Sequence, residues 1–318
     1  MVKHLIIKSR WVSIALILIA LFTALAVVIG HLNGDPIADP RLSSKYLDGF
    51  KHPTQVVKFD EGFIVAEMKT PKLMYKSTLA EASNKEFTVG DHEIKSPHFL
   101  AAYNHGVFVS EGRGEHVVFH NRHGEIELPH FSEGLRLNRP HGICVSSDGW
   151  LYIADSANSR LLRVNLKTRT SEVFKDNKRR IAYGRQLLCR EDGLWLANSY
   201  EGAFKLNPGQ GGNILHIKDF DSGEVKEVIA FHKANVTGLA LLDEKVMIVG
   251  RWSGHYDLVV VDLETQKVTK KLTQFERQLD APYGISLDEE QRKFYVSFLG
   301  ISRERLEGED GGVLEFSY

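Results

Sequence analysis

The chain has 318 residues, of which 43% are hydrophobic, 10% aromatic and 25% charged. This composition is that of a folded globular protein, and it excludes intrinsic disorder and a small scaffold held together by disulfides. The 40 Lys and Arg residues nearly balance the 41 Asp and Glu residues, so a dedicated nucleic-acid-binding protein is not expected.

The first predicted element is a membrane anchor at residues 11–30, WVSIALILIALFTALAVVIG, which carries no charge. A helix of this length, at about 1.5 Å per residue, spans the hydrocarbon core of a bilayer. Three basic residues and no acidic residue precede it: Lys3, Lys8 and Arg10. The positive-inside rule therefore places residues 1–10 in the cytoplasm. A cleaved signal peptide is the alternative, because small residues at 23–26 offer a cleavage site.

Either interpretation exports the rest of the chain to the periplasm, an organelle lumen or the extracellular space. Residues 31–42 contain Gly34, Pro36 and Pro40, and they are interpreted as a spacer that leads away from the membrane. Residues 43–318 then form the main domain.

The main domain contains a repeat, which is clearest from Arg139 to Val164. An apolar strand is followed by Asp148-Gly149, a second strand at 150–155, a polar loop and a third strand. Asp-Gly between two strand patterns predicts a tight hairpin.

Six copies of this pattern follow one another along the chain. Equivalent positions at the start of each copy are Thr54, His98, His141, Arg185, Thr237 and Tyr283, with spacings of 44, 43, 44, 52 and 46 residues. Repeats of this length made of short strands predict an all-β fold, a six-bladed β-propeller with four-stranded blades.

The last copy is too short to complete a blade by itself. After Gly312 it has room for one strand, at 313–316. Because an open ring would expose strand edges, we expect residues 43–50 to supply the outer strand of the last blade.

The best copy resembles an NHL repeat, through Pro140-His141-Gly142, Asp148-Gly149 and the stretch from Tyr152 to Arg160. More broadly, the chain resembles the six-bladed superfamily of SMP-30/gluconolactonase-like and strictosidine-synthase-like proteins. The resemblance implies the propeller fold. Because SMP-30-like enzymes use a divalent metal in their channel, it also implies a metal site there. Propellers also serve as binders, hydrolases, lyases and scaffolds, so the fold does not select an activity.

Two rings of residues are expected on one face of the propeller, near its central channel. The six equivalent positions given above form the inner ring. The second ring follows the second strand of each copy and consists of Glu67, Glu111, Asp155, Asn198, Gly250 and Phe298. The oxygen-bearing side chains of its first four members suit a hard cation such as Ca²⁺. The alternative is that each of them caps its own turn through backbone N–H groups.

His98 and His141 occupy equivalent positions in adjacent blades, so their side chains are expected to approach each other. Together with Glu111 they suit Zn²⁺ with an open coordination position, or a general base. The alternative is that Pro-His-Gly belongs to the repeat and the imidazole bonds a neighbouring loop.

The other half of the same face is expected to be basic and aromatic. Its candidate ligand-binding residues are Arg185, Arg251, Trp252 and Tyr283, with His255 and Tyr256 beside them. This mixture suits an anionic or sugar-like ligand, and a solvated loop is the alternative. The charged loop at 299–311 is a candidate lid or partner contact.

Two cysteines are too few for a disulfide framework or a four-thiolate zinc site. Cys144 and Cys189 lie on the first strands of neighbouring blades, one position out of step. Because side chains alternate along a strand, we expect them to point to different faces and to remain buried free thiols.

The function favoured by the sequence is a membrane-anchored, exported propeller that binds a small anionic ligand, a glycan or a protein on its channel face. A metal-dependent hydrolase or lactonase of SMP-30-like type is the second candidate. A histidine-based lyase is the third.

Overall fold

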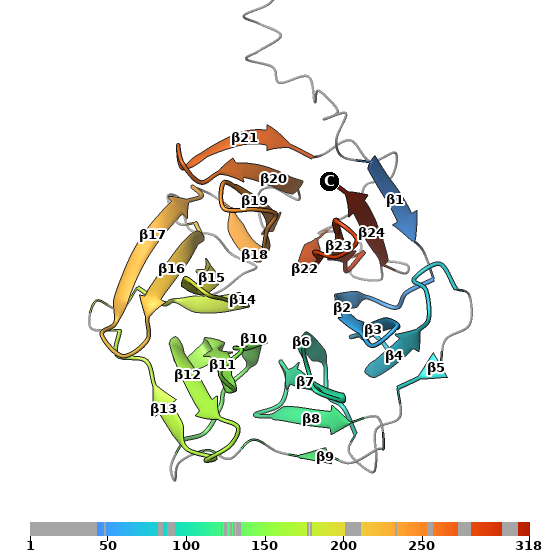
Figure 1. Cartoon of the computed structure of the whole chain (residues 1–318), viewed down its shortest axis with the longest axis horizontal. Helices are drawn as coiled ribbons and strands as arrows, with labels where there is room; N and C mark the ends of the chain where they lie inside the picture. The colour runs from blue at the N-terminus through green and yellow to red at the C-terminus, as the bar shows by residue number, and fades with distance from the viewer. Residues whose placement is uncertain are drawn as a thin grey trace, which may run out of the picture. The chain divides into compact units, whose positions relative to one another are not determined.

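In the computed structural model of the protein, the residues described are 43–47, 49–81, 85–87, 93–121, 123, 126–127, 129, 131, 135–176, 178, 180–200, 211–232, 234–252, 257–272, 281–300 and 311–318. They form six antiparallel four-stranded sheets arranged around an axis (Figure 1). The six-bladed propeller predicted from the repeat is confirmed. The predicted anchor at 11–30 lies outside these residues, and no helix within them is long and apolar enough to span a membrane.

The first three blades follow the chain from the axis outward. Blade 1 contains β2 (Pro53–Phe59), β3 (Gly62–Glu67), β4 (Lys72–Lys76) and β5 (Lys85–Glu86). Blade 2 contains β6 (Pro97–Tyr103), β7 (Gly106–Glu111), β8 (Val117–Asn121) and β9 (Ile126–Glu127). Blade 3 contains β10 (Pro140–Val145), β11 (Trp150–Asp155), the short 3₁₀ helix η1 (Ser156–Asn158), β12 (Arg160–Asn165) and β13 (Ser171–Val173).

The last three blades continue the same order, and the sixth also uses the first strand of the domain. Blade 4 contains β14 (Tyr183–Arg190), β15 (Gly193–Ser199), β16 (Asn213–Asp219) and β17 (Glu224–Ala230). Blade 5 contains β18 (Asn235–Leu241), β19 (Val246–Trp252), β20 (Asp257–Asp262) and β21 (Lys267–Lys271). Blade 6 contains β22 (Pro282–Asp288), β23 (Lys293–Phe298), β24 (Gly312–Ser317) and β1 (Ser43–Leu47).

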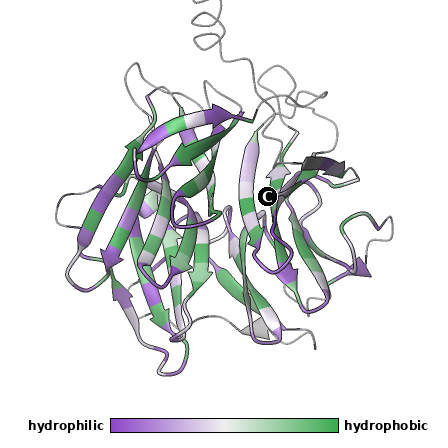
Figure 2. Ribbon diagram, turned by 45° about the horizontal axis from the view of Figure 1, so that its top comes forward, coloured by the Kyte–Doolittle hydropathy of each residue, from purple (hydrophilic) through white to green (hydrophobic). Residues whose placement is uncertain are grey.

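The core lies between the blades, because each sheet packs one face against the next sheet. Second strands such as β3 and β7 are buried along their whole length, whereas outer strands such as β17 and β21 are mostly exposed. Figure 2 shows the same gradient as apolar residues along the inner strands and hydrophilic residues on the outer strands and turns. A blade alone would leave both faces uncovered, so the ring must close.

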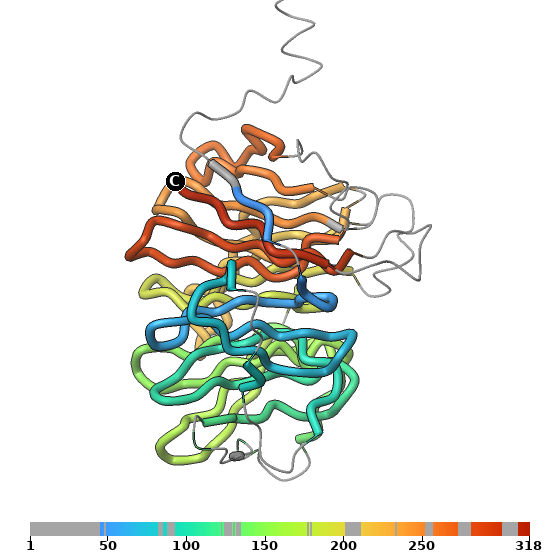
Figure 3. Tube along the Cα trace, turned by 90° about the vertical axis from the view of Figure 1, so that its right-hand side faces the viewer, coloured from blue at the N-terminus to red at the C-terminus, as the bar shows by residue number. Residues whose placement is uncertain are grey.

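Closure comes from β1, which pairs antiparallel with β24 from Ser43–Ser317 to Leu47–Val313. Figure 3 shows the blue β1 alongside the red β24. The expectation that residues 43–50 complete the last blade is confirmed. Phe50, directly after β1, is fully buried in the cluster that also contains Phe63 and Tyr295, so this segment joins blade 6 to blade 1 through its side chains as well.

The expectation of two free thiols is wrong, because Cys144 and Cys189 form a disulfide, with 5.7 Å between their Cα atoms. The two positions are out of step by one residue, as the sequence indicates. Neighbouring blades, however, meet through opposite faces of their own sheets. Cys144 shares a face of blade 3 with Tyr152, and Cys189 shares the facing side of blade 4 with Leu194, so the offset directs the two thiols toward each other.

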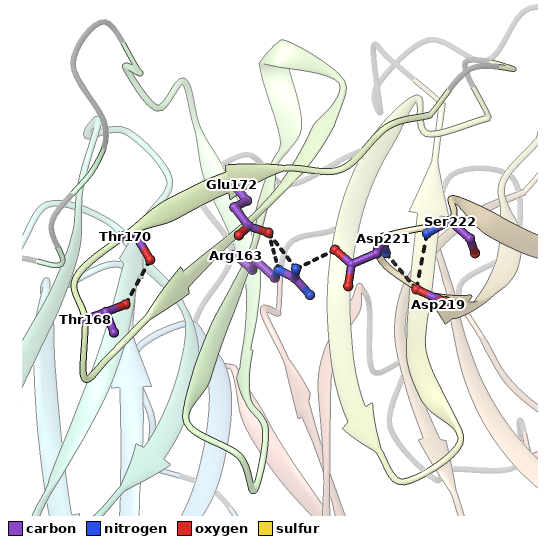
Figure 4. A network of polar contacts seen from close by, with 7 residues as sticks. All are labelled: Arg163, Thr168, Thr170, Glu172, Asp219, Asp221 and Ser222. Carbon is purple, nitrogen blue, oxygen red and sulfur yellow. Dashed lines mark hydrogen bonds and ion pairs between the residues drawn. The ribbon is translucent and has the colours of Figure 1, made fainter.

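Blades 3 and 4 are also joined at the outer end of the same seam. The Arg163 guanidinium contacts Glu172 of its own blade at 2.5 Å and Asp221 of blade 4 at 2.6 Å (Figure 4). Its Cζ atom lies 4.3 Å from the centroid of Trp150 and 4.5 Å from that of Phe220. Asp219 accepts backbone N–H bonds from Asp221 and Ser222 and fixes the turn that presents Asp221. Blades 3 and 4 are therefore joined by a disulfide near the axis and by the Arg163 guanidinium, which contacts two aromatic rings, farther out.

Deleting residues 1–48 should destabilise the propeller far more than deleting residues 1–38. Both deletions remove the predicted anchor, but the first also removes β1, which leaves the backbone groups of β24 without their strand partner while retaining Phe50. Melting temperatures of the two shortened proteins check this. Equal melting temperatures would contradict the closure described above.

Candidate functional site

The inner ring predicted from the sequence coincides with a break in strand pairing that recurs in all six blades. The register between the first and second strand shifts at one place in each sheet: Pro53/Gln55, Pro97/Leu100, Pro140/Ile143, Gly184/Leu187, Val236/Gly238 and Pro282/Ile285. Every inner-ring residue lies in such a shift. Because a bulge redirects the side chain it contains, the repeat turns these six side chains out of the regular alternation.

Two members of the inner ring serve the fold. The Thr54 hydroxyl donates to the Pro97 carbonyl of the next blade at 3.0 Å, and the Thr237 hydroxyl donates to the Pro282 carbonyl at 2.7 Å. Both threonines are buried. They tie adjacent blades together at equivalent positions, which leaves the other four members as candidates for function.

Those four, His98, His141, Arg185 and Tyr283, come together with Tyr183 and are called the histidine–arginine cluster below. The centroids of the His98 and His141 rings are 4.4 Å apart, and that of Tyr283 is 5.6 Å from His98. The Arg185 Nη1 atom lies 3.5 Å from the Tyr283 hydroxyl oxygen, and its Cζ atom lies 4.8 Å from the Tyr183 ring centroid. Blades 2, 3, 4 and 6 thus contribute to one cluster, in which no side chain is more than 8% exposed.

Both histidines of the cluster are held in the neutral form. Burial, together with the charges of Arg185, Arg139 and Arg113, lowers the pKa of His98 to about 3. Burial, His98 and Arg185 lower the pKa of His141 well below its usual value. Burial also raises the pKa of Tyr283 to about 12. His98, His141 and Tyr283 are therefore neutral at physiological pH, next to the Arg185 guanidinium.

The hydrogen bonds assign chemical roles to the two imidazoles. The Nδ1 atom of His141 lies 2.8 Å from the Arg139 carbonyl oxygen, which only accepts, so Nδ1 carries the proton and Nε2 is left as an acceptor or base. The Nε2 atom of His98 lies 3.3 Å from the Ser96 hydroxyl, and its Nδ1 has no hydrogen-bond partner among the described residues. The pair can therefore accept or donate a proton next to a buried guanidinium.

Five of the six residues predicted for the second ring occupy equivalent positions in the strand pairing, and the sixth has to be corrected. Glu67, Glu111, Asp155, Asn198 and Phe298 each lie opposite the residue that begins the first strand of their blade, or the residue after it. In blade 5 that position belongs to Arg251, which lies opposite Val236, and not to Gly250. The longer spacing before blade 5 does not reveal from the sequence that the second-ring position moves by one residue.

In blades 3, 4 and 5 the second-ring side chain contacts the first residue of the third strand of its own blade, which is Asn213 for Asn198 in blade 4. Asp155 lies across from Arg160, with 2.7 Å between Oδ2 and Nε. Blade 5 has the reverse arrangement, because Arg251 contacts Asp257 through two bonds of 2.7 and 2.5 Å. Opposite charges directly across two strands stabilise the pair. The predicted ligand-binding residue Arg251 is thus buried with its own counter-ion.

Three of the four predicted metal ligands accept hydrogen bonds from backbone N–H groups that lie 16 or 17 residues earlier in the chain. Glu67 accepts from the Lys51 N–H at 3.0 Å, Asp155 from the Asn138 N–H at 2.6 Å, and Asn198 from the Ala182 N–H at 2.9 Å. Glu111 belongs to the same ring and is fully buried. Within the described residues, no three His, Cys, Asp or Glu side chains gather as a metal ion requires. These bonds agree with the capping alternative in that backbone N–H groups donate them, but the donors precede the first strand of the blade and do not belong to each residue's own turn.

The remaining candidates lie wholly or partly outside the described residues. These are the side chain of Trp252, His255, Tyr256, and residues 301–310 of the predicted lid loop.

Two buried glutamines at the axis were missed by the sequence reasoning. Gln186 accepts the Leu239 N–H at 3.3 Å and the Ile285 N–H at 2.9 Å, and it donates to the Ile285 carbonyl at 2.5 Å. Gln55 accepts the Leu100 N–H at 2.6 Å and donates to the Ser286 hydroxyl at 3.3 Å.

The signal for these glutamines lies one residue after each inner-ring position, where the six copies have Gln55, Phe99, Gly142, Gln186, Gly238 and Gly284. A Cβ atom on Gly238 would lie 2.8 Å from Gln186 Oε1, and one on Gly284 would lie 3.1 Å from the Gln55 side chain. The glycines thus leave the space that the glutamines fill. A comparison of the copies at this position would have indicated the arrangement.

Comparisons with known proteins agree with this fold. The sequence model of the NHL repeat matches residues 137–163, which include β10 and β11. No curated protein sequence matches the chain. Among solved structures, a gluconolactonase from Xanthomonas campestris has a TM-score of 0.63 at 12% identity, covering 88% of this chain and 91% of that one.

Other propellers with different activities are similar to a comparable degree. A streptogramin B lyase has a TM-score of 0.56 at 11% identity, covering 87% of this chain and 98% of that one. A chain of a nidogen/laminin complex has a TM-score of 0.59 at 13% identity, covering 74% of this chain and 84% of that one. The chain is thus a six-bladed propeller with an NHL repeat, whose structural neighbours are SMP-30/gluconolactonase-like and related propeller proteins. At these identities the likeness defines the fold alone.

Acid should destabilise the propeller through His98 and His141. Above the unfolded pKa of about 6.5 both histidines are neutral in either state and have no linkage effect. Below it both histidines bind protons in the unfolded chain and stay unprotonated in the folded protein. The free energy of unfolding therefore falls as the pH drops from about 6.5 toward the folded pKa of His98 near 3. Each histidine contributes up to about 1.4 kcal/mol per pH unit.

Urea unfolding at pH 7 and pH 4.5 measures this effect. The double variant His98→Gln/His141→Gln should lose much of the pH dependence, whatever its stability at pH 7. His232→Gln, at an exposed position, is the control and should behave as the unchanged protein. An unchanged pH dependence in the double variant would contradict the burial of two neutral histidines.

Proposed function

We propose that the protein is a membrane-anchored, exported propeller that binds a small anionic ligand at the histidine–arginine cluster. The observation that carries this proposal is the buried Arg185 guanidinium, which lies against the Tyr283 hydroxyl and the Tyr183 ring. The three charged side chains that shift the pKa of His98 are Arg185, Arg139 and Arg113, and all are cationic. Arg185 is only 5% exposed, so an anion that reaches it would form a charge-assisted hydrogen bond in a poorly solvated environment.

The neutral histidines suit the same kind of ligand. The Nδ1 atom of His98, which has no hydrogen-bond partner among the described residues, can donate to an anion without adding a charge, whereas the N–H group of His141 is already used by the Arg139 carbonyl. The Tyr183 and Tyr283 rings offer flat surfaces. The affinity for a carboxylate should therefore be nearly constant across the neutral pH range, whereas that for a phosphate follows the titration of the phosphate itself. A carboxylate or phosphate of a small, partly planar molecule matches these groups.

Export is supported by two independent features. The uncharged stretch at 11–30, preceded by three basic residues, has the pattern of a signal anchor. The disulfide between Cys144 and Cys189 is of a kind that persists in oxidising compartments such as the periplasm or the secretory pathway. Neither feature depends on the other.

An enzymatic role is the second candidate, because His141 presents an unprotonated Nε2 beside His98. Such a base could assist a lyase or a hydrolase. Among the structural neighbours, a gluconolactonase and a streptogramin B lyase represent these two activities. A lactonase of SMP-30-like type would need a divalent metal. Metal analysis of the purified protein, before and after a chelator, tests that requirement.

Replacing Arg185 should abolish anion binding without unfolding the domain. Isothermal titration of the full chain with gluconate and with inorganic phosphate should show binding of at least one, and none of glucose. Arg185→Gln should weaken that binding at least tenfold, because it removes the buried charge. Arg169→Gln, at an exposed turn, is the matched control. Equal affinity in the two variants, or binding of none of the probes, would contradict the proposal.

The C-terminus should be accessible from outside the cell. A tag placed after Tyr318 should be digested by a protease added to intact cells or spheroplasts, because the basic residues before the anchor hold the N-terminus in the cytoplasm. Protection of the tag until the cells are lysed would overturn the predicted topology. Digestion of a cytoplasmic marker in the same sample would show that the membrane had leaked.

A further inference from the structure

The end of the channel opposite the histidine–arginine cluster contains a cavity of about 320 Å³ that is lined by all six inner strands. It is called the apolar funnel below. Its walls are mostly hydrophobic and include Val57, Leu100, Ile143, Leu187, Ala240 and Leu241. Its charged residues, Lys58, Arg190 and Glu289, come from the last residues of inner strands or from just beyond one. A cavity of this size and lining is suited to an apolar group of a small ligand.

The floor of the funnel is formed by Gln55 and Gln186, whose amides are hydrogen-bonded to blades 2, 5 and 6 as described above. Amides used in this way leave little for a ligand to bind, so the floor acts as a partition. The two ends of the channel are thus separate sites with different chemistry.

The funnel adjoins a second cavity, of about 670 Å³, on the same side of the propeller. The two share Val145, Cys189, Arg190, Leu241 and Glu289. The second cavity is called the acidic groove, because it is lined by five carboxylates and one guanidinium: Glu191, Asp192, Asp243, Glu244, Glu289 and Arg190. Since Arg190 pairs with Glu289 at 2.5 Å, the other four carboxylates have no Lys or Arg partner among the residues that line the groove. Asp192 has one neighbour outside that lining, the His216 imidazole, with 3.3 Å between Oδ2 and Nε2.

Hydrogen bonds hold two of these carboxylates in place. Asp192 accepts from the Trp195 indole N–H at 3.2 Å, and Asp243 accepts from the Lys245 and Val246 N–H groups at 2.7 Å. Trp195 also lines the groove and stacks on His216, with 4.2 Å between ring centroids. A rigid negative surface beside an aromatic ring is suited to an organic cation.

We propose that this end of the channel binds an elongated amphipathic cation, with its apolar chain in the funnel and its ammonium group in the acidic groove. The funnel offers a mostly hydrophobic wall to the chain, with its charged residues near the ends of the inner strands, and the connected groove offers negative charge within reach of the same molecule. A neutral amphiphile would gain the first contact alone. An anionic one would be repelled by the carboxylates. The site is independent of the anion site proposed above, because the glutamine floor lies between them.

Three probes with the same chain length test the proposal: hexylammonium, 1-hexanol and hexanoate. Each is titrated calorimetrically into the full chain in a non-ionic detergent, with detergent alone as the blank. Hexylammonium should bind at least tenfold more tightly than 1-hexanol, and hexanoate should not bind. Added salt should weaken the binding of hexylammonium more than that of 1-hexanol. Equal binding of the three probes, or no binding of hexylammonium, would overturn the proposal.

Matched variants locate the site. Ala102 is exposed and lines the funnel, so Ala102→Trp should block it and reduce hexylammonium binding at least tenfold, whereas Ala230→Trp on the exposed outer strand β17 should not. Glu191→Gln/Glu244→Gln should weaken hexylammonium and spare 1-hexanol, with Glu224→Gln as the control. Arg185→Gln should leave hexylammonium binding unchanged, which separates this test from that of the anion site. Loss of binding in Ala230→Trp or Arg185→Gln would place the probe elsewhere and refute the assignment.

Discussion

Six strand edges meet at the axis of the propeller, and the backbone groups on those edges have to find partners in a narrow space. An inner strand pairs with its own blade on one side alone, so its other edge faces the axis. Gln55 and Gln186 meet part of this need by bonding the main chain of three other blades, and glycines opposite them provide the room. The register shift at the same level turns the inner-ring side chains toward one another. The position of the histidine–arginine cluster is therefore a consequence of how the axis is filled.

The same arrangement gives the two ends of the channel different linings. On one side of the glutamines, Arg185 lies among neutral aromatic and imidazole groups, and other arginines add to the positive field around His98. On the other side, the inner strands line the mostly hydrophobic funnel, which adjoins the acidic groove. Lys and Arg nearly balance Asp and Glu over the whole chain, so the composition does not indicate where charged residues gather. Their places at the two ends of the channel follow from how the blades are assembled.

The sequence was sufficient to predict the number of blades, the strands within them and the use of β1 in the last blade, because these follow from the repeat period and from the need to bury sheet edges. It also placed His98 beside His141, because equivalent positions of adjacent blades meet at the axis. It failed where the outcome depends on how two sheets face each other. The alternation rule gave the correct faces for Cys144 and Cys189 within each blade, but those are the faces that pack together. Arg251 was missed in the second ring for a similar reason, since the position shifts with the local register of blade 5.

The ribosome makes β1 before every other strand of the propeller, but β1 pairs with β24, which is made last. Some 270 residues separate Ser43 from Gly312, so at about 5–20 residues per second β1 waits roughly 15 to 50 seconds for β24 to be synthesised. During that interval the growing chain is an open arc with an unpaired strand at its beginning and an uncovered sheet at its end. Two such chains held side by side can exchange their first strands, each completing the last blade of the other, with the same residue pairs as in the single ring. Crowding of nascent chains therefore favours an interlocked dimer over the closed single ring.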